Sequence, residues 1–158
     1  MSANTSNHER TAQKMFSEMI KSVIAPVLRD YEFRGSRNAF SKELSHCQCS
    51  VGFQKSIYSN RIEIEYCTNI AVVHTPTMDE FYRKRKDAGS NRRFVDVPVI
   101  GNWFSRLERL DPTLNGQWRR FSIGSSVLEA GESWLKSFEA FGLPAILEEV
   151  RKAEIQKS

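Results

Sequence analysis

Alternating apolar and polar residues predict a β-hairpin over residues 46–73, and this hairpin organises the rest of the chain. Its first arm has apolar residues at every second position, Cys47, Cys49, Val51 and Phe53, and its second arm repeats the pattern at Ile62, Ile64 and Tyr66. This period is typical of a strand with one buried face. If the two apolar faces coincide, a partner can reach the opposite face, which carries Gln48, Ser50, Gly52, Gln54, Glu63, Glu65 and Cys67.

Helical spacing dominates the region before the hairpin. Apolar residues three and four positions apart predict a helix from about Glu9 to Asp30 with one buried stripe: Phe16, Met19, Ile20, Val23, Ile24, Val27 and Leu28. Pro26 lies on the polar side of this helix and should kink its last turns rather than end it. We expect the helix to lie across the hairpin, because each has a single apolar face to bury.

A third strand should join this helix to the hairpin. We expect the chain to turn at Gly35-Ser36 and then to form a strand that ends near Glu43, with Phe33 and Phe40 as apolar anchors. Together with the two arms of the hairpin, this strand makes an antiparallel meander, and three strands are about the minimum for a stable sheet.

Several shorter patterns follow the hairpin. Pro76 and the pair Thr77 and Glu80 indicate the start of a helix that reaches about Arg85. The later patterns predict an exposed loop over 86–93, an extended edge segment over 95–99, a helical face formed by Trp103, Phe104, Leu107 and Leu110 and ended by Asp111-Pro112, and a strand over 118–123.

The end of the chain again reads as helix. Ser126 and Glu129 form a capping box, and a buried stripe follows at Val127, Trp134, Leu135, Phe138 and Phe141. We expect Gly142 to end this helix and Leu143-Pro144 to begin another. The predicted fold is therefore α+β: a single domain over residues 9–150, with an antiparallel meander sheet packed on one face by the N-terminal and C-terminal helices. Residues 1–8 should form a flexible terminus and 151–158 a charged tail.

Composition is consistent with this single domain. The chain has 158 residues, 40% of them hydrophobic and 27% charged, and a net charge of +4. This mild excess of positive charge permits an acidic partner without requiring one. Three cysteines, no secretion signal and no apolar run of about 20 residues predict a cytoplasmic protein that does not enter a membrane.

The order of these elements resembles a bacterial family known as domain of unknown function 4304. The resemblance rests on the opening helix, Asn38-Ala39-Phe40, the strand Val51-Gly-Phe-Gln-Lys-Ser56, the segment Thr68-Asn-Ile-Ala71 and Gly142-Leu143-Pro144. It implies a fold and no established activity. The chain departs from the family at Glu32, where a glycine usually precedes the phenylalanine.

Metal and catalytic sites find little support in the residue pattern. Cys47 and Cys49 have the parity of the apolar face, whereas His46 and Cys67 have the opposite parity, so four metal ligands do not converge. His74 is the only histidine in a position suited to a catalytic base, and its alternative is a strand-end histidine that only forms hydrogen bonds. No hydrolase, nucleotide-binding or cofactor motif occurs, so we expect a binding protein without a cofactor rather than an enzyme.

Two groups of residues are candidates for binding. Gln54, Lys55 and Arg61 could line the rim of a polar sheet surface that grips a partner, although Lys55 has the parity of the apolar face, so that either the strand ends before it or its side chain extends past the sheet edge. The second group is basic and comprises Arg83, Lys84, Arg85, Lys86, Arg92 and Arg93. Near aromatic residues it could bind nucleic acid, or it could be a solvated charged surface.

These candidates give three hypotheses for function. The first is a protein-binding module, such as an immunity or defence-associated protein that blocks another protein. The second is a nucleic-acid-binding protein that uses the basic segment 83–93. The third is a hydrolase that uses His74.

Overall fold

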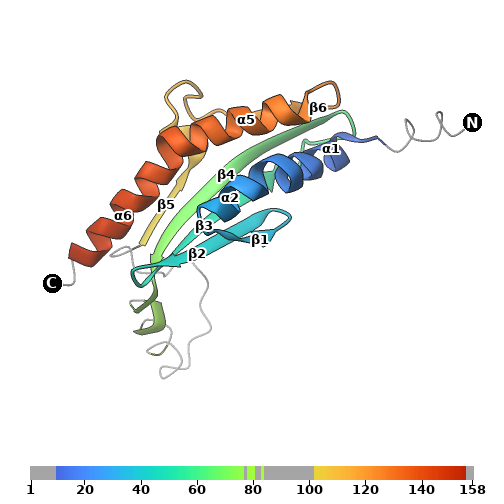
Figure 1. The fold of residues 1–158 in the computed structure, drawn as a ribbon. Coiled ribbons are helices and arrows are strands. Elements are labelled where there is room, and N and C mark those ends of the chain that lie inside the picture. The colour runs from blue at the N-terminus through green and yellow to red at the C-terminus, as the bar shows by residue number, and fades with distance from the viewer. Residues whose placement is uncertain (1–9, 77, 81–82, 84–101, 156–158) are drawn as a thin grey trace, which may run out of the picture.

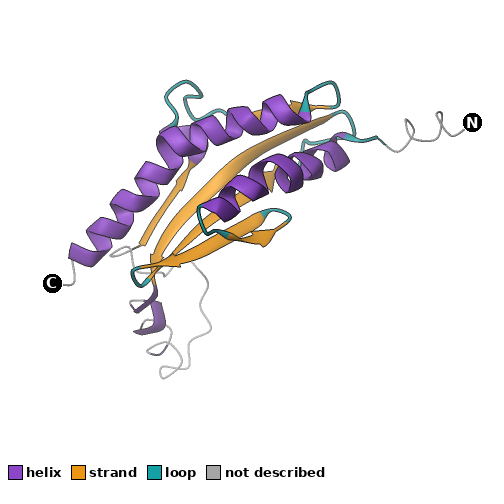
Figure 2. Ribbon diagram, viewed as in Figure 1, coloured by secondary structure: helices purple, strands orange, loops and turns teal. Residues whose placement is uncertain are grey.

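The fold is a six-stranded antiparallel sheet with long helices on one face (Figure 1). The computed structural model describes residues 10–76, 78–80, 83 and 102–155. In chain order the elements are α1 (Ala12–Met19), η2 (Ile20–Ile24), α2 (Ala25–Asp30), β1 (Arg34–Ser36), β2 (Ala39–Leu44), β3 (Cys47–Lys55), β4 (Glu63–His74), β5 (Asn102–Arg106), α4 (Leu107–Leu110), β6 (Arg119–Ser122), α5 (Val127–Ser137), η4 (Phe138–Gly142) and α6 (Leu143–Ile155). The predicted α+β class and its covered sheet face are confirmed (Figure 2).

Strands β1 to β5 follow one another across the sheet in sequence order, so the predicted meander is confirmed. In the central hairpin Val51 pairs with Ile70, which places the apolar positions of β3 and β4 on the same face. The other edge of β4 is shared, because β5 pairs with residues 69–73 and β6 pairs with residues 63–66. The long strand β4 therefore holds the two halves of the chain together.

The core lies between this sheet and the helices. Aromatic rings fill its centre: the ring centroids of Phe16 and Tyr66 are 4.7 Å apart, those of Phe53 and Trp134 are 5.0 Å apart, and those of Trp134 and Phe138 are 5.1 Å apart. Burial of such rings is among the largest contributions to the stability of a domain. Cys47 and Cys49 lie on this core face, as their parity predicts, and are fully buried.

Both long helices contain a π-helical turn just before a proline. In η2 the N–H of Ala25 donates to the carbonyl of Ile20, and Pro26 follows, while in η4 the N–H of Leu143 donates to the carbonyl of Phe138, and Pro144 follows. Proline has no N–H to donate to the helix. Because each proline follows a wider π turn, its missing donor does not interrupt a regular series of α-helical hydrogen bonds. The helix therefore continues past Pro26, as predicted.

The prediction that Gly142 ends the C-terminal helix is wrong. The helix passes through Gly142 and runs without a break to Ile155. Gly142 is needed for packing instead, because a Cβ atom there would lie 2.8 Å from Cδ2 of Phe138 and 3.1 Å from Cδ1 of Leu107. Residues 151–155, which we expected in a charged tail, are part of this helix, and Ala153 is buried.

The turn between the first two strands lies at Arg37-Asn38, not at Gly35-Ser36 as predicted. Gly35 sits within β1 and pairs with Phe40. Its backbone approaches Ala39 so closely that a Cβ atom would lie 2.1 Å from the carbonyl oxygen. The glycine therefore serves a close contact between strands, and Arg37 takes the positive φ of 62° that the turn requires.

The predicted helical face from Trp103 to Leu110 is only half correct. Residues 102–106 form strand β5, and the helix α4 covers only residues 107–110. The long edge of β4 offers unpaired backbone groups at residues 69–73, and pairing with them overrides the helical spacing of the aromatic residues. The strand predicted over 118–123 is confirmed as β6.

A helix begins at Thr75 after β4, as predicted, and residues 75, 76, 78–80 and 83 are helical. Residues 1–8, Lys84, Arg85, the loop predicted over 86–93 and the edge segment over 95–99 lie outside the described residues. No helix in the described part of the chain is long and apolar enough to cross a membrane.

Candidate functional site

One face of the sheet faces away from the long helices. We call it the outer face, and along β3 and β4 it carries Gln48, Ser50, Gly52, Gln54, Glu63, Glu65, Cys67, Asn69, Ala71 and Val73. On β5 the same face carries Phe104, whose partner in register is Ala71, and the Phe104 side chain is 60% exposed. The outer face thus combines polar side chains with one large aromatic ring in water.

Polar contacts order the middle of the outer face. The side-chain amide of Asn69 donates to Oε1 of Gln54 at 2.9 Å, and Sγ of Cys67 lies 3.8 Å from the same oxygen. Cys67 thus lies on the outer face, as predicted, yet it is buried, and this burial raises the pKa of its thiol. A Cβ atom at Gly52 would fit without strain, because the nearest atom, the carbonyl oxygen of Asn38, would lie 3.7 Å away.

Arginine and aromatic side chains meet at the edge of the outer face. The Arg106 guanidinium lies 5.3 Å from the centroid of the Trp118 ring, a cation–π contact between β5 and the start of β6. Nearby, Nε of Arg120 lies 3.8 Å from a carboxylate oxygen of Glu63, and the Arg120 side chain remains 71% exposed.

The loop that joins β3 to β4 is held by a dense set of hydrogen bonds. We call residues 56–62 the tip loop. The side chain of Asn60 accepts from the backbone N–H groups of Ile62 at 2.8 Å and Glu63 at 2.9 Å, and the N–H of Ser56 donates to the carbonyl of Glu65 at 2.7 Å. The carbonyl of Arg61 accepts from the N–H of Ala12 at 2.7 Å, which ties the loop to the first turn of α1.

This ordered loop displays large apolar side chains to water. Ile57 is 90% exposed, Tyr58 is 79% exposed and Ile62 is 65% exposed. Ile123, also exposed, lies next to Ile62, because its N–H donates to the carbonyl of Ile62 at 2.8 Å. The prediction that Ile62 belongs to the core is therefore wrong: β4 begins one residue later, and helix α1 begins at the level of Arg61 and does not extend over it.

The predicted rim residues lie on different surfaces. Gln54 is on the outer face, whereas Lys55 is on the helix side, where its Nζ atom reaches 6.0 Å from the ring centroid of Phe16 and the residue stays exposed. This agrees with a side chain that extends past the sheet edge. Arg61 is exposed at the end of the tip loop, so Lys55 and Arg61 flank this loop at its two ends. In the basic group, Arg83 is exposed and the other five residues lie outside the described part of the chain.

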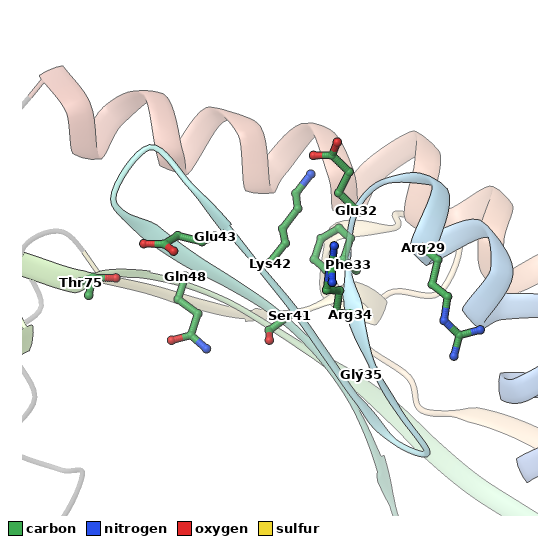
Figure 3. Close-up of a pocket in the computed structure, with 10 residues that line it drawn as sticks. All are labelled: Arg29, Glu32, Phe33, Arg34, Gly35, Ser41, Lys42, Glu43, Gln48 and Thr75. Atoms are coloured by element: carbon green, nitrogen blue, oxygen red, sulfur yellow. The ribbon is translucent and has the colours of Figure 1, made fainter.

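A groove of about 1100 Å³ follows the free edge of the sheet (Figure 3). Its lining residues are Arg29, Glu32, Phe33, Arg34, Gly35, Ser41, Lys42, Glu43, Gln48 and Thr75. The Lys42 ammonium donates to the carbonyl of Tyr31 at 3.0 Å and lies 4.9 Å from the ring centroid of Phe33, so it is already engaged within the protein. The groove offers both signs of charge and no convergent catalytic set.

His74 and Cys47 are partners in register at one end of the sheet, and both are buried. His74 ends β4 and is only 3% exposed. Burial, together with the neighbouring Cys47, raises the pKa of Cys49 to about 11, which disfavours the thiolate needed for metal binding or nucleophilic attack. Among the described residues, no three His, Cys, Asp or Glu side chains come together as metal ligands.

Sequence reasoning missed the exposed residues Ile57, Tyr58 and Phe104. The first two lie between the arms of the hairpin, and an apolar pair next to Ser56 and Ser59 in a predicted turn is the signal that could have identified them. Phe104 was missed because the spacing of apolar residues in its segment predicted a helix with Phe104 on the buried face.

Comparison with known families adds one match. Residues 24–122 match the family model described as a domain of unknown function, DUF4304, a range that begins in η2 and ends with β6. No match was found among the curated proteins or among the solved structures. The matched range covers more than half of the chain, and the chain therefore belongs to the DUF4304 family.

Proposed function

We propose that this chain is a binding module that holds another protein on the outer face of its sheet. The observation that carries the proposal is the exposure of Phe104 at the middle of β5, on a face that no long helix of the described chain covers. A rigid strand holds this aromatic ring in water, and covering the ring with a partner lowers the free energy of the system. Aromatic residues are also enriched at protein interfaces.

The surroundings of Phe104 suit a protein partner. The Arg106–Trp118 pair supplies a flat cationic surface, and Gln54 with Asn69 supplies amide donors and acceptors. Arginine and tryptophan are the residue types that most often dominate the energy of protein contacts, and polar groups commonly surround them. This composition supports a specific interface rather than a purely solvated surface.

We further propose that the partner is a protein whose activity this module blocks, as an immunity or defence-associated protein of the bacterial cytoplasm would. The small size of the domain and a broad open face, which one partner can cover, support this role.

Affinity measurements on a purified partner test the proposal. A protein captured by the immobilised chain would be purified and titrated against the wild type, Phe104→Asp and the control Leu147→Asp, which lies on α6 and is also exposed. Phe104→Asp should weaken binding by at least about tenfold, because it places a charge at the centre of the contact, and the control should bind like the wild type. Equal binding by Phe104→Asp would contradict the proposal. A blocking role predicts that the partner loses its activity when the chain is added in equal amount.

Nucleic-acid binding is the second candidate, and the Arg106–Trp118 contact favours it. Bases stack on exposed aromatic rings, and arginine neutralises phosphate. The expected result is salt-dependent binding of a fluorescent single-stranded oligonucleotide that Arg106→Ala weakens. No binding at low salt would exclude this candidate.

A hydrolase that uses His74 stays a prediction. The imidazole is buried, so a substrate reaches it only if the covering residues move. Hydrolytic activity that His74→Asn abolishes without loss of folding would support it, and activity unchanged by the substitution would contradict it.

A further inference from the structure

The tip loop is too well ordered to be a simple connection. Asn60 fixes its end through two backbone hydrogen bonds, and the Ser59 hydroxyl bridges both backbone groups of Glu65, accepting from its N–H at 3.1 Å and donating to its carbonyl at 3.2 Å. Gln13 on α1 donates to the carbonyl of Asn60 at 2.9 Å. These contacts order the backbone that follows Ile57 and Tyr58, so less backbone entropy remains to be lost when the loop binds.

The apolar side chains of the tip make no contribution to the core. Ile57, Tyr58 and Ile62 are mostly exposed, and Ile123, in the turn after β6, lies next to Ile62. Single exposed apolar residues are ordinary, but several at one end of a small domain indicate a contact surface. A rigid apolar protrusion of this kind fits a concave apolar pocket on another molecule.

The charges around the tip define the rim of that pocket. Lys55 and Arg61 are exposed at the two ends of the loop, and Glu63, at the start of β4, is paired with Arg120. Glu65 is half-buried and its backbone is engaged by Ser59. A partner that carries acidic side chains around an apolar pocket would match both the protrusion and its charged border.

We propose that the tip loop is the docking element of this module, which inserts Ile57 and Tyr58 into an apolar pocket with an acidic rim on a protein partner. This rests on the proposed protein-binding function and names where the partner is held. An anionic membrane fits less well, because binding to anionic lipids is typical of clusters of about four to eight basic residues, whereas two of the described residues that flank this loop in sequence are basic, Lys55 and Arg61. A second copy of the chain fits less well too, since a two-fold contact between tips would bring their cations together.

Photo-crosslinking locates the contact directly. A benzoylphenylalanine is placed at Tyr58, at Phe104 or at Leu147 as the control, and each full-length variant is irradiated with the purified partner captured as above. A crosslink from position 58 to a partner peptide that contains apolar and acidic residues is the expected result. A crosslink from position 104 alone leaves the proposed function in place and overturns the tip proposal, whereas no crosslink from either position counts against both.

Affinities complete the test. Ile57→Ser and Tyr58→Ser should each weaken partner binding by at least about tenfold, and Lys55→Glu with Arg61→Glu should weaken it and reduce its salt dependence. Thermal unfolding of the two serine variants should match the wild type, because neither Ile57 nor Tyr58 lies in the core. Unchanged affinity in the serine variants overturns the proposal. So does tip-dependent binding to phosphatidylglycerol vesicles in place of the protein, or tip-dependent self-association in sedimentation.

Discussion

The Glu108 carboxylate accepts a hydrogen bond of 2.6 Å from the backbone N–H of Thr68, at the place where β4 passes from one edge partner to the other. Strand β6 pairs with β4 up to Tyr66 and β5 pairs from Asn69, so Thr68 lies in the gap between them. The carboxylate takes the place of a strand carbonyl there. Nε of Arg119 lies 3.3 Å from the other oxygen, and both side chains are largely buried.

Without this carboxylate the domain should unfold at a much lower concentration of denaturant. Glu108→Ala leaves the buried N–H of Thr68 without an acceptor and the buried Arg119 cation without a partner, and breaking such a buried pair costs about 3–5 kcal/mol. Urea denaturation followed by tryptophan fluorescence measures the change. Glu108→Gln keeps an acceptor for Thr68 and should lose less stability, and an alanine variant as stable as the wild type would show that the pair is dispensable.

Replacement of Glu32 by glycine should stabilise the domain. The first helix ends in a Schellman motif: the N–H of Glu32 donates to Arg29 and that of Phe33 donates to Leu28, both at 2.9 Å, and Glu32 has a φ of 70°. This backbone conformation is unfavourable for a residue with a Cβ atom and favours glycine. Glu32→Gly should raise the free energy of unfolding by about 0.5–1 kcal/mol, while the control Glu32→Ala should change it little. A destabilised glycine variant would contradict this geometry.

Gly131→Ala should destabilise the domain, although glycine-to-alanine changes usually stabilise helices. Glycine to alanine in a helix normally stabilises by about 1 kcal/mol. At this position the new Cβ atom would lie 2.4 Å from Cγ1 of Val23, so α5 and η2 would have to separate. We expect Gly131→Ala to lower the free energy of unfolding by about 1–3 kcal/mol. The double variant Val23→Ala, Gly131→Ala tests the cause. Without Cγ1 of Val23, Gly131→Ala should cost less stability than it does in the wild type, although Cβ of residue 23 still lies 2.7 Å from the new Cβ atom.

Acid should destabilise the domain through Asp111. Burial would raise the pKa of this carboxyl, but hydrogen bonds from Ser137 and Thr113 and the nearby charge of Arg119 hold it below its ordinary value of 3.8. A carboxyl with a lowered pKa in the folded state contributes stability above its unfolded pKa and loses it as the pH falls through the folded pKa. The free energy of unfolding should therefore fall as the pH drops below about 4. Ser137→Ala should reduce that fall, and an identical acid dependence in this variant would count against the role of Asp111.

The hairpin could be predicted because its physical signal is local. Apolar positions such as Val51 and Ile64 repeat with the period of a strand. Because successive side chains of a strand point to opposite faces, Cys67 must lie on the face opposite Ile64, which is the outer face. The strand β5 could not be predicted in this way, since its pairing with residues 69–73 of β4 depends on a neighbour about 30 residues away. The role of Gly142 was hidden for the same reason, because the atoms that require a glycine belong to Leu107 and Phe138.

The candidate surface was predicted only in outline. Lys55 and Arg61 border the tip loop, whose exposed apolar residues lie between them in the sequence. Ile62 was predicted to be buried because it lies two residues before Ile64 in the strand pattern. Period alone does not reveal that α1 begins at the level of Arg61 and that Ile62 stays 65% exposed. The exposure of an apolar residue depends on where the covering layer ends, and that is a property of the assembled fold.

Hydrogen exchange on the complex tests the central claim most directly. Amide exchange of the full chain, alone and with its purified partner, would be measured by mass spectrometry at peptide resolution. The account predicts that the partner slows exchange in residues 56–62 and in β5 around Phe104, with little change in α6. Slower exchange confined to the helices, with the tip loop and β5 unchanged, would contradict it.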